Sequence, residues 1–160
     1  MIDDFVAVAR AELEETGTAV AQDVIVVGAA ALFSGKHVLL NSGSAELRRS
    51  VSRAFISAAV ATGLSAGHVE VHLNSARIQS AGWGSGLFDD ASAARLWLLI
   101  SDVDLWHFGS TALARKIAAS RLTDPDLRTL ATAAGIRRRP LDRGWQTIQN
   151  AFAWVEVVAS

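Results

Sequence analysis

The sequence predicts an α+β domain in which a long helix and flanking helices cover a five-stranded antiparallel sheet. Residues 23–33 and 96–100 are unbroken apolar runs, which are typical of strands covered on both faces at the centre of a sheet. Residues 45–62 repeat apolar side chains at the spacing of one long amphipathic helix. Residues 68–73 alternate polar and apolar side chains, which indicates a strand with one covered face.

The first elements follow from apolar spacing and turn residues. Residues 2–16 carry apolar side chains at helical spacing, and Gly17 is suited to end that helix. Residues 23–33 are rich in Val and Ile and short, so they are predicted as a strand. A Ser-Gly turn then leads into a second strand over 36–40, and the two strands are predicted to form a hairpin.

A second group of elements surrounds the long helix. The polar residues 41–44 cap the helix predicted over 45–62, and Gly63 ends it. The strand at 68–73 is expected to turn back into residues 76–80 as a second hairpin.

The C-terminal part is predicted as one central strand followed by helices. Residues 96–100 form the strand, which we expect to lie beside residues 24–31, and residues 102–122 form the next helix. An Asp-Pro pair begins a short helix ending near residue 134, and Asp142 caps a last helix to residue 158. The domain is therefore drawn over 1–122, with a two-helix extension over 123–160.

Composition excludes several classes of function. The chain has 160 residues, no cysteine, and 15 Lys and Arg against 16 Asp and Glu, so thiol chemistry is excluded and bulk nucleic-acid or anionic-membrane binding is disfavoured. Its longest apolar run is about half the length of a membrane-spanning helix. The first residues lack the basic and apolar regions of a secretion signal, so we expect a cytoplasmic protein.

Two segments carry a family resemblance. Residues 26–40, VVGAAALFSGKHVLL, and residues 96–109, LWLLISDVDLWHFG, resemble the roadblock (dynein light chain) family, although Trp106–Phe108 depart from its last turn. Longin, PAS-like and GAF-like domains share parts of the same topology. The roadblock resemblance covers about residues 2–122 and implies a non-enzymatic, dimeric regulator or scaffold without a cofactor, with a small Ras-like GTPase as its partner.

The resemblance also implies where such a protein would bind. The dimer would form through the long helix and the edge strand, at Val51, Phe55, Ala58, Val69 and Val71. The surface for another protein is predicted at two places. Trp154 lies outside the buried stripe of the predicted last helix, and Arg137, Arg138 and Arg139 form a basic cluster before it.

The alternative is a metal-binding or small-ligand-binding sensor or enzyme. Alternation along a strand puts His68, Glu70 and His72 on one face, and this residue set can hold Zn²⁺, Fe²⁺ or Mn²⁺. The opposing interpretation is a solvated polar face. The glycine-rich residues 82–86 could close over a ligand or simply connect two elements.

Other motifs in the sequence give weaker evidence of a functional site. Residues 27–36 fail the phosphate-loop pattern, because Ala30 replaces its first glycine and His37 its hydroxyl residue. No Ser nucleophile has a convincing His and acid nearby in the sequence. Capping explains the paired carboxylates, which are Asp89, Asp90, Asp102 and Asp104.

Overall fold

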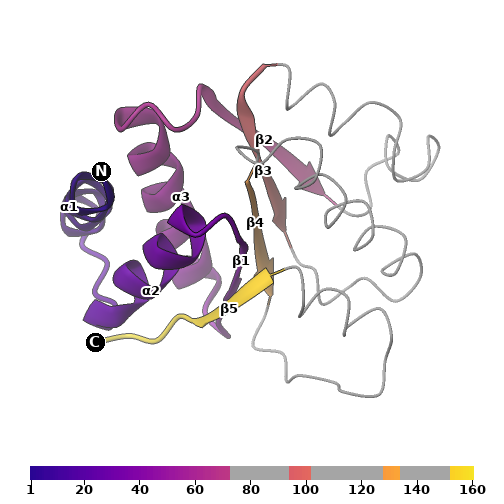
Figure 1. Ribbon diagram of the computed structural model, residues 1–160. Helices are drawn as coiled ribbons and strands as arrows, with labels where there is room; N and C mark the ends of the chain where they lie inside the picture. The colour runs from indigo at the N-terminus through magenta and orange to yellow at the C-terminus, as the bar shows by residue number, and fades with distance from the viewer. Residues whose placement is uncertain (73–93, 102–127, 134–151) are drawn as a thin grey trace.

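The computed structural model describes residues 1–72, 94–101, 128–133 and 152–160, and Figure 1 shows their arrangement. Within these ranges the chain forms three helices and five strands. In chain order they are α1 (Ile2–Glu15), α2 (Gln22–Phe33), β1 (His37–Asn41), α3 (Ala45–Ala61), β2 (Gly67–His72), β3 (Leu96–Ser101), β4 (Thr129–Ala133) and β5 (Phe152–Glu156).

The five strands form one parallel sheet in the order β2-β3-β4-β1-β5. Leu130 of β4 pairs with Val38 of β1 on one side and with Leu99 of β3 on the other. Every residue of β1 and β4 is buried, as expected for parallel strands covered on both faces. The predicted antiparallel α+β sheet is therefore wrong, and the fold is α/β.

The apolar run over 23–33 is a helix and not a strand. In α2 the buried side chains form a helical stripe that includes Val24, Ile25 and Leu32, while Val26 and Val27 are exposed. Packing of this stripe overrides the strand preference of Val and Ile. Residues 24–31 consequently have no place beside residues 96–100 in the sheet, and the predicted first hairpin does not form.

The predicted C-terminal helical hairpin is also wrong. Residues 129–133 form β4, which lies between β3 and β1, and residues 152–156 form the edge strand β5. Phe152 and Val155 of β5 are buried in the strand. After β5 the chain pairs with the link between α1 and α2, where the Ala21 N–H donates to Val158 O at 2.9 Å.

Several local predictions are confirmed. The helices expected at 2–16 and 45–62 correspond to α1 and α3, and the strands expected at 36–40, 68–73 and 96–100 correspond to β1, β2 and β3. Gly17 and Gly63 follow the two helices with φ values of 71° and 77°, which glycine adopts without strain. The strand predicted at 76–80 and the helix predicted at 102–122 lie outside the described residues.

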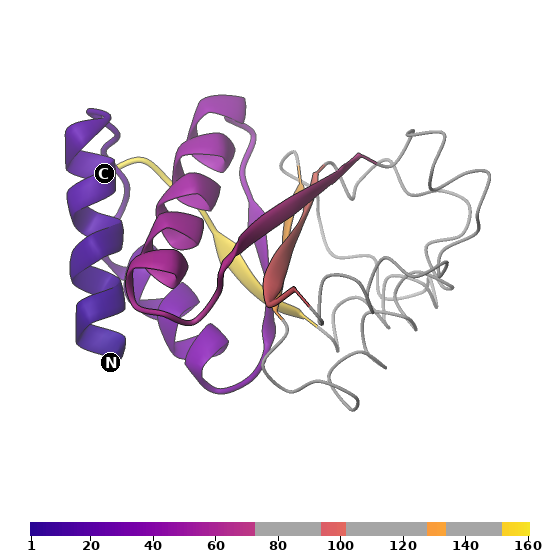
Figure 2. The same cartoon turned by 90° about the horizontal axis from the view of Figure 1, so that it is seen from above.

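All three helices cover one face of the sheet, with α1 outermost (Figures 1 and 2). Phe5 of α1 and Phe55 of α3 meet in this layer with stacked rings 5.8 Å apart. Alternate sheet residues, including Val38, Leu99 and Leu130, join the same core. In the described part of the chain, no helix is long and apolar enough to cross a membrane.

Gly28 of α2 leaves room for the ring of Phe55 from α3. A Cβ atom at this position would lie 2.5 Å from Cζ of Phe55, whose side chain is fully buried. We expect Gly28→Ala to lower the free energy of unfolding by about 1–3 kcal/mol, because the overpacked ring must shift. Urea denaturation measures the change. Ala30→Gly, at an exposed position of the same helix, controls for a simple change in helix propensity. Unchanged stability of Gly28→Ala would contradict the close packing.

Candidate functional site

A short connection joins β1 to α3. Ser44 caps the helix, because its Oγ accepts a hydrogen bond from the Leu47 N–H at 3.2 Å. Ser42 Oγ accepts from the Ser44 N–H at 3.1 Å. Arg48 Nη1 donates to Ser42 O at 2.6 Å and so ties the first turns of the helix back to this connection. The turn is compact, and the guanidinium of Arg48 is held against it.

The order of the strands places this connection at a switch point of the sheet. From β1 the chain passes through α3 to β2 at one edge, whereas the strand that follows β4 is β5 at the other edge. Because β1 and β4 are neighbours, their carboxyl ends border the point where the direction of winding reverses. In open parallel sheets, ligands bind outside the carboxyl ends of strands at such a point.

A cavity of about 350 Å³ lies between α3 and this end of the sheet. This volume is at the lower end of the range of small-molecule sites. The strand residues that line the cavity lie on the sheet face covered by the helices. Glu70 pairs with Leu99, and Ser101 and Thr132 lie two residues after Leu99 and Leu130, which belong to the core under the helices. The lining residues are Ala45, Arg48, Arg49, Ser52 and Arg53 from α3, and Glu70, Leu99, Ser101 and Thr132 from the sheet.

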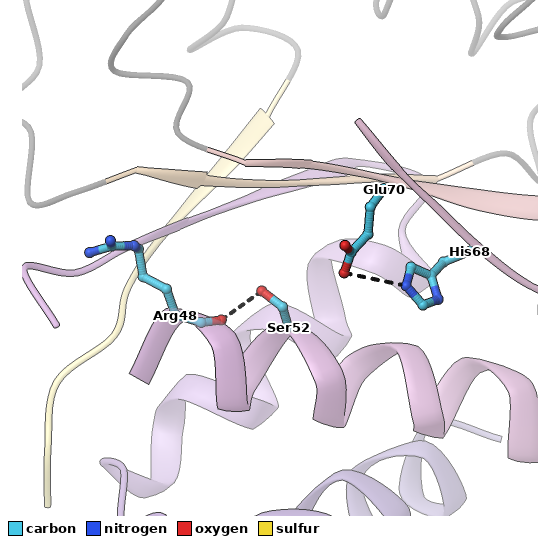
Figure 3. Close-up of polar contacts among 4 residues, drawn as sticks. All are labelled: Arg48, Ser52, His68 and Glu70. Atoms are coloured by element: carbon cyan, nitrogen blue, oxygen red, sulfur yellow. Dashed lines mark hydrogen bonds and ion pairs between the residues drawn. The ribbon is translucent and has the colours of Figure 1, made fainter. Parts of the chain in front are cut away.

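The charge of the cavity is positive. Three arginines face one carboxylate, Glu70, in the described lining. Glu70 also has a histidine beside it, since its Oε1 lies 3.7 Å from Nε2 of His68. Figure 3 shows both side chains reaching from β2 toward α3, and the Arg48 guanidinium extending away from them. Arginine binds phosphate groups through paired N–H donors, so this lining favours a phosphate-bearing ligand.

A buried serine of α3 bonds to the backbone of its own helix beside the cavity. Ser52 is buried, and its Oγ donates to the carbonyl oxygen of Arg48 at 2.7 Å (Figure 3). Arg48 is half-buried, whereas Arg49 and Arg53 are exposed. One guanidinium is therefore fixed by the connection from β1, and two remain in contact with solvent.

The connection from β1 to α3 is not a phosphate-binding loop. That motif, G-x-x-x-x-G-K-[ST], joins a strand to a helix. Here the connection is residues 42–44, because α3 begins at Ala45. When the motif is aligned from the end of β1, its four positions fall on Ser42, Leu47, Arg48 and Arg49, so none of its residues is present. Residues 27–36, which were compared with the motif above, lie in α2 and the turn after it.

The proposed metal ligands are only partly described. The pairing of β2 with β3 confirms that His68, Glu70 and His72 alternate with Val69 and Val71, and Glu70 lines the cavity. Among the described residues, no group of three His, Cys, Asp or Glu side chains lies close enough together to hold a metal ion. The side chain of His72 is not described.

The proposed self-association residues lie mostly in the interior. Val51, Phe55 and Ala58 are fully buried in the core of their own chain, and Val69 is half-buried. The side chain of Val71 is not described. Self-association itself stays a prediction.

Trp154 of the proposed partner surface is half-buried in β5 beside Leu39 of β1. Other predicted features lie outside the described residues. They are residues 82–86, Arg137, Arg138 and Arg139, and the carboxylates Asp89, Asp90, Asp102 and Asp104.

Several solved structures are similar to this fold, among them a helicase loader and PCH-2. The DnaC helicase loader superposes with a TM-score of 0.54 at 9% identity, over 83% of this chain and 87% of the loader. PCH-2 of C. elegans superposes with a TM-score of 0.51 at 17% identity, over 99% of this chain but 42% of PCH-2. This chain thus spans less than half of PCH-2. At these identities the likeness shows the fold alone.

Comparisons by sequence give no relative. No protein-family model matches the chain. No curated protein sequence matches it either. The two structural neighbours and the parallel sheet contradict the roadblock resemblance, so the prediction of a roadblock-like, non-enzymatic scaffold is wrong.

Proposed function

We propose that this chain binds a nucleotide through its phosphates in the cavity between α3 and the carboxyl ends of β2, β3 and β4. The observation that carries the proposal is that Arg48, Arg49 and Arg53 all line one cavity, whose described lining contains a single carboxylate. Charge-assisted bonds from guanidinium groups to phosphate are about twice as strong as neutral hydrogen bonds.

The position of the cavity supports the same proposal. It lies beside the switch point between β1 and β4 and at the N-terminal half of α3, where backbone N–H groups favour anions. The solved structures similar to this fold show the fold alone and carry no argument about a ligand.

The lining also suggests how selective the site is. Its described apolar residues are Ala45 and Leu99, and no aromatic ring in the described lining is placed to stack on a base. We therefore expect recognition to depend on the phosphates, so that ATP and GTP bind with similar affinity. Pyrophosphate should compete with both nucleotides.

Titration calorimetry with ATP tests the proposal. We expect Arg53→Ala to weaken binding roughly ten- to hundredfold, because a hydrogen bond to a charged group contributes about 1.5–3 kcal/mol. Arg53 is exposed, so its replacement should leave the melting temperature unchanged. Arg10→Ala is the matched control, since it removes the same charge from α1, which contributes nothing to the described lining. Absence of ATP binding, or equal losses in both variants, would refute the proposed site.

A further inference from the structure

Glu70 lines the cavity but lies apart from the arginines that share it. Its side chain reaches from β2 toward α3, whereas the Arg48 guanidinium extends away from it (Figure 3). Within the described residues, the ion-pair partner of Glu70 is His68, and none of the three arginines lies at ion-pair distance from its carboxylate. The described lining therefore has a cationic part on α3 and an anionic part on β2.

The carboxylate of Glu70 can accept hydrogen bonds from a ligand. Nε2 of His68 lies 3.7 Å from its Oε1, which is too long for a hydrogen bond, and the Glu70 side chain is exposed. An ionised carboxylate accepts hydrogen bonds at both oxygens and donates none. It attracts hydroxyl groups and repels phosphate. The phosphates of a nucleotide are therefore expected beside the arginines, and its hydroxyl groups beside Glu70.

The lining extends far enough to contact both parts of one nucleotide. Glu70 pairs with Leu99 of β3, and β3 pairs with β4, which contributes Thr132. Neighbouring strands lie about 5 Å apart, so the lining extends about 10 Å across the sheet from Glu70 to Thr132. The cavity volume of about 350 Å³ is at the lower end for small-molecule sites. These dimensions suit a ribose with its phosphates and leave the base outside the described lining.

We infer that Glu70 accepts a hydrogen bond from a ribose hydroxyl of the bound nucleotide, so that the site selects nucleotides whose sugar carries hydroxyls. In dinucleotide-binding parallel sheets, an acidic side chain accepts from a ribose hydroxyl by the same chemistry. The ribose is common to ATP and GTP, so this selection agrees with similar affinity for both. The inference rests on the proposed function and deepens it, because it adds the sugar to the phosphates as a recognised group.

Calorimetric titration of the full chain with ATP and with 2′,3′-dideoxy-ATP tests the inference. The two ligands carry the same charge, so the ratio of their dissociation constants reports on the hydroxyls and not on the arginines. We expect the dideoxy ligand to bind about tenfold more weakly, because it loses a hydrogen bond to a charged group. Equal binding of the two ligands would overturn the inference and leave the phosphate site intact. No binding of ATP would overturn the proposed function itself.

Two carboxylate variants assign the effect to Glu70. Glu70→Val removes both acceptor oxygens and keeps a strand-forming side chain, so we expect the ratio to fall to about one. Glu46→Ala is the matched control, because Glu46 is an exposed carboxylate in the first turn of α3 and outside the described lining. This control should keep the ratio of the parent chain. A ratio that Glu70→Val leaves unchanged, or that Glu46→Ala lowers equally, would show that Glu70 does not contact the sugar.

Discussion

Phe55→Ala is expected to lower the free energy of unfolding by about 3–5 kcal/mol, which is the usual cost of emptying a buried phenylalanine site. The Phe55 side chain has no exposed surface, stacks on Phe5 at 5.8 Å and lies against the backbone of Gly28. One substitution therefore removes contacts to both other helices of the layer. Urea denaturation followed by circular dichroism measures the loss.

Val60→Ala provides the matched control for that experiment. Val60 belongs to the same helix but is 46% exposed, so its truncation should change stability by less than about 0.5–1 kcal/mol. Equal losses at Phe55 and Val60 would contradict the packing of α3 against α1 and α2. Phe55 was also predicted to lie on a dimer surface. Because its side chain is buried, a Phe55→Asp variant would test folding and not self-association.

The helices and strands that the sequence predicted correctly are those with local signals. For α3, the apolar period of the helix, the Ser44 cap and the Gly63 stop all lie within or next to the element. For β2, alternation is visible within six residues. Such signals do not depend on where the rest of the chain lies, so these elements could be placed without a structure.

The errors arose where long-range packing decides the structure. Residues 22–33 are so apolar that both a buried strand and a buried helix satisfy their composition, and contact with α3 through Gly28 selects the helix. Residues 152–156 become a strand because they pair with β1, more than 100 residues earlier. Neither partner can be identified from the local sequence, and the parallel order of the sheet depends on both.

The candidate site was missed for a related reason. Arg48, Arg49 and Arg53 lie off the apolar stripe of α3, where charged side chains usually face solvent. Their joint placement on a cavity requires β3 and β4 to lie opposite the helix, which only the sheet order provides. The local sequence does place two adjacent arginines, Arg48 and Arg49, near the start of a serine-capped helix. It lacks the glycines, the lysine and the hydroxyl residue of a phosphate-binding loop, so no motif indicated the site.

The double variant Arg49→Glu/Arg53→Glu is expected to abolish nucleotide binding. Each arginine lost removes about 1.5–3 kcal/mol of charge-assisted hydrogen bonding, and each new carboxylate adds repulsion toward phosphate. The dissociation constant for ATP should therefore rise by a factor of at least about 100, which is the product of two tenfold losses. Titration of both proteins with ATP at low salt gives the comparison, since salt weakens interactions between exposed charges.

Stability should be almost unaffected in this double variant, because both arginines are exposed and surface ion pairs contribute little to folding. Arg10→Glu is the control for the change in net charge, since Arg10 lies on α1 and outside the described lining. If Arg10→Glu weakened ATP binding as strongly as the double variant, ATP would be attracted by the net charge of the whole chain. The cavity would then not be the ATP-binding site. If the double variant bound ATP like the parent while remaining folded, the phosphates would have to bind elsewhere on the molecule.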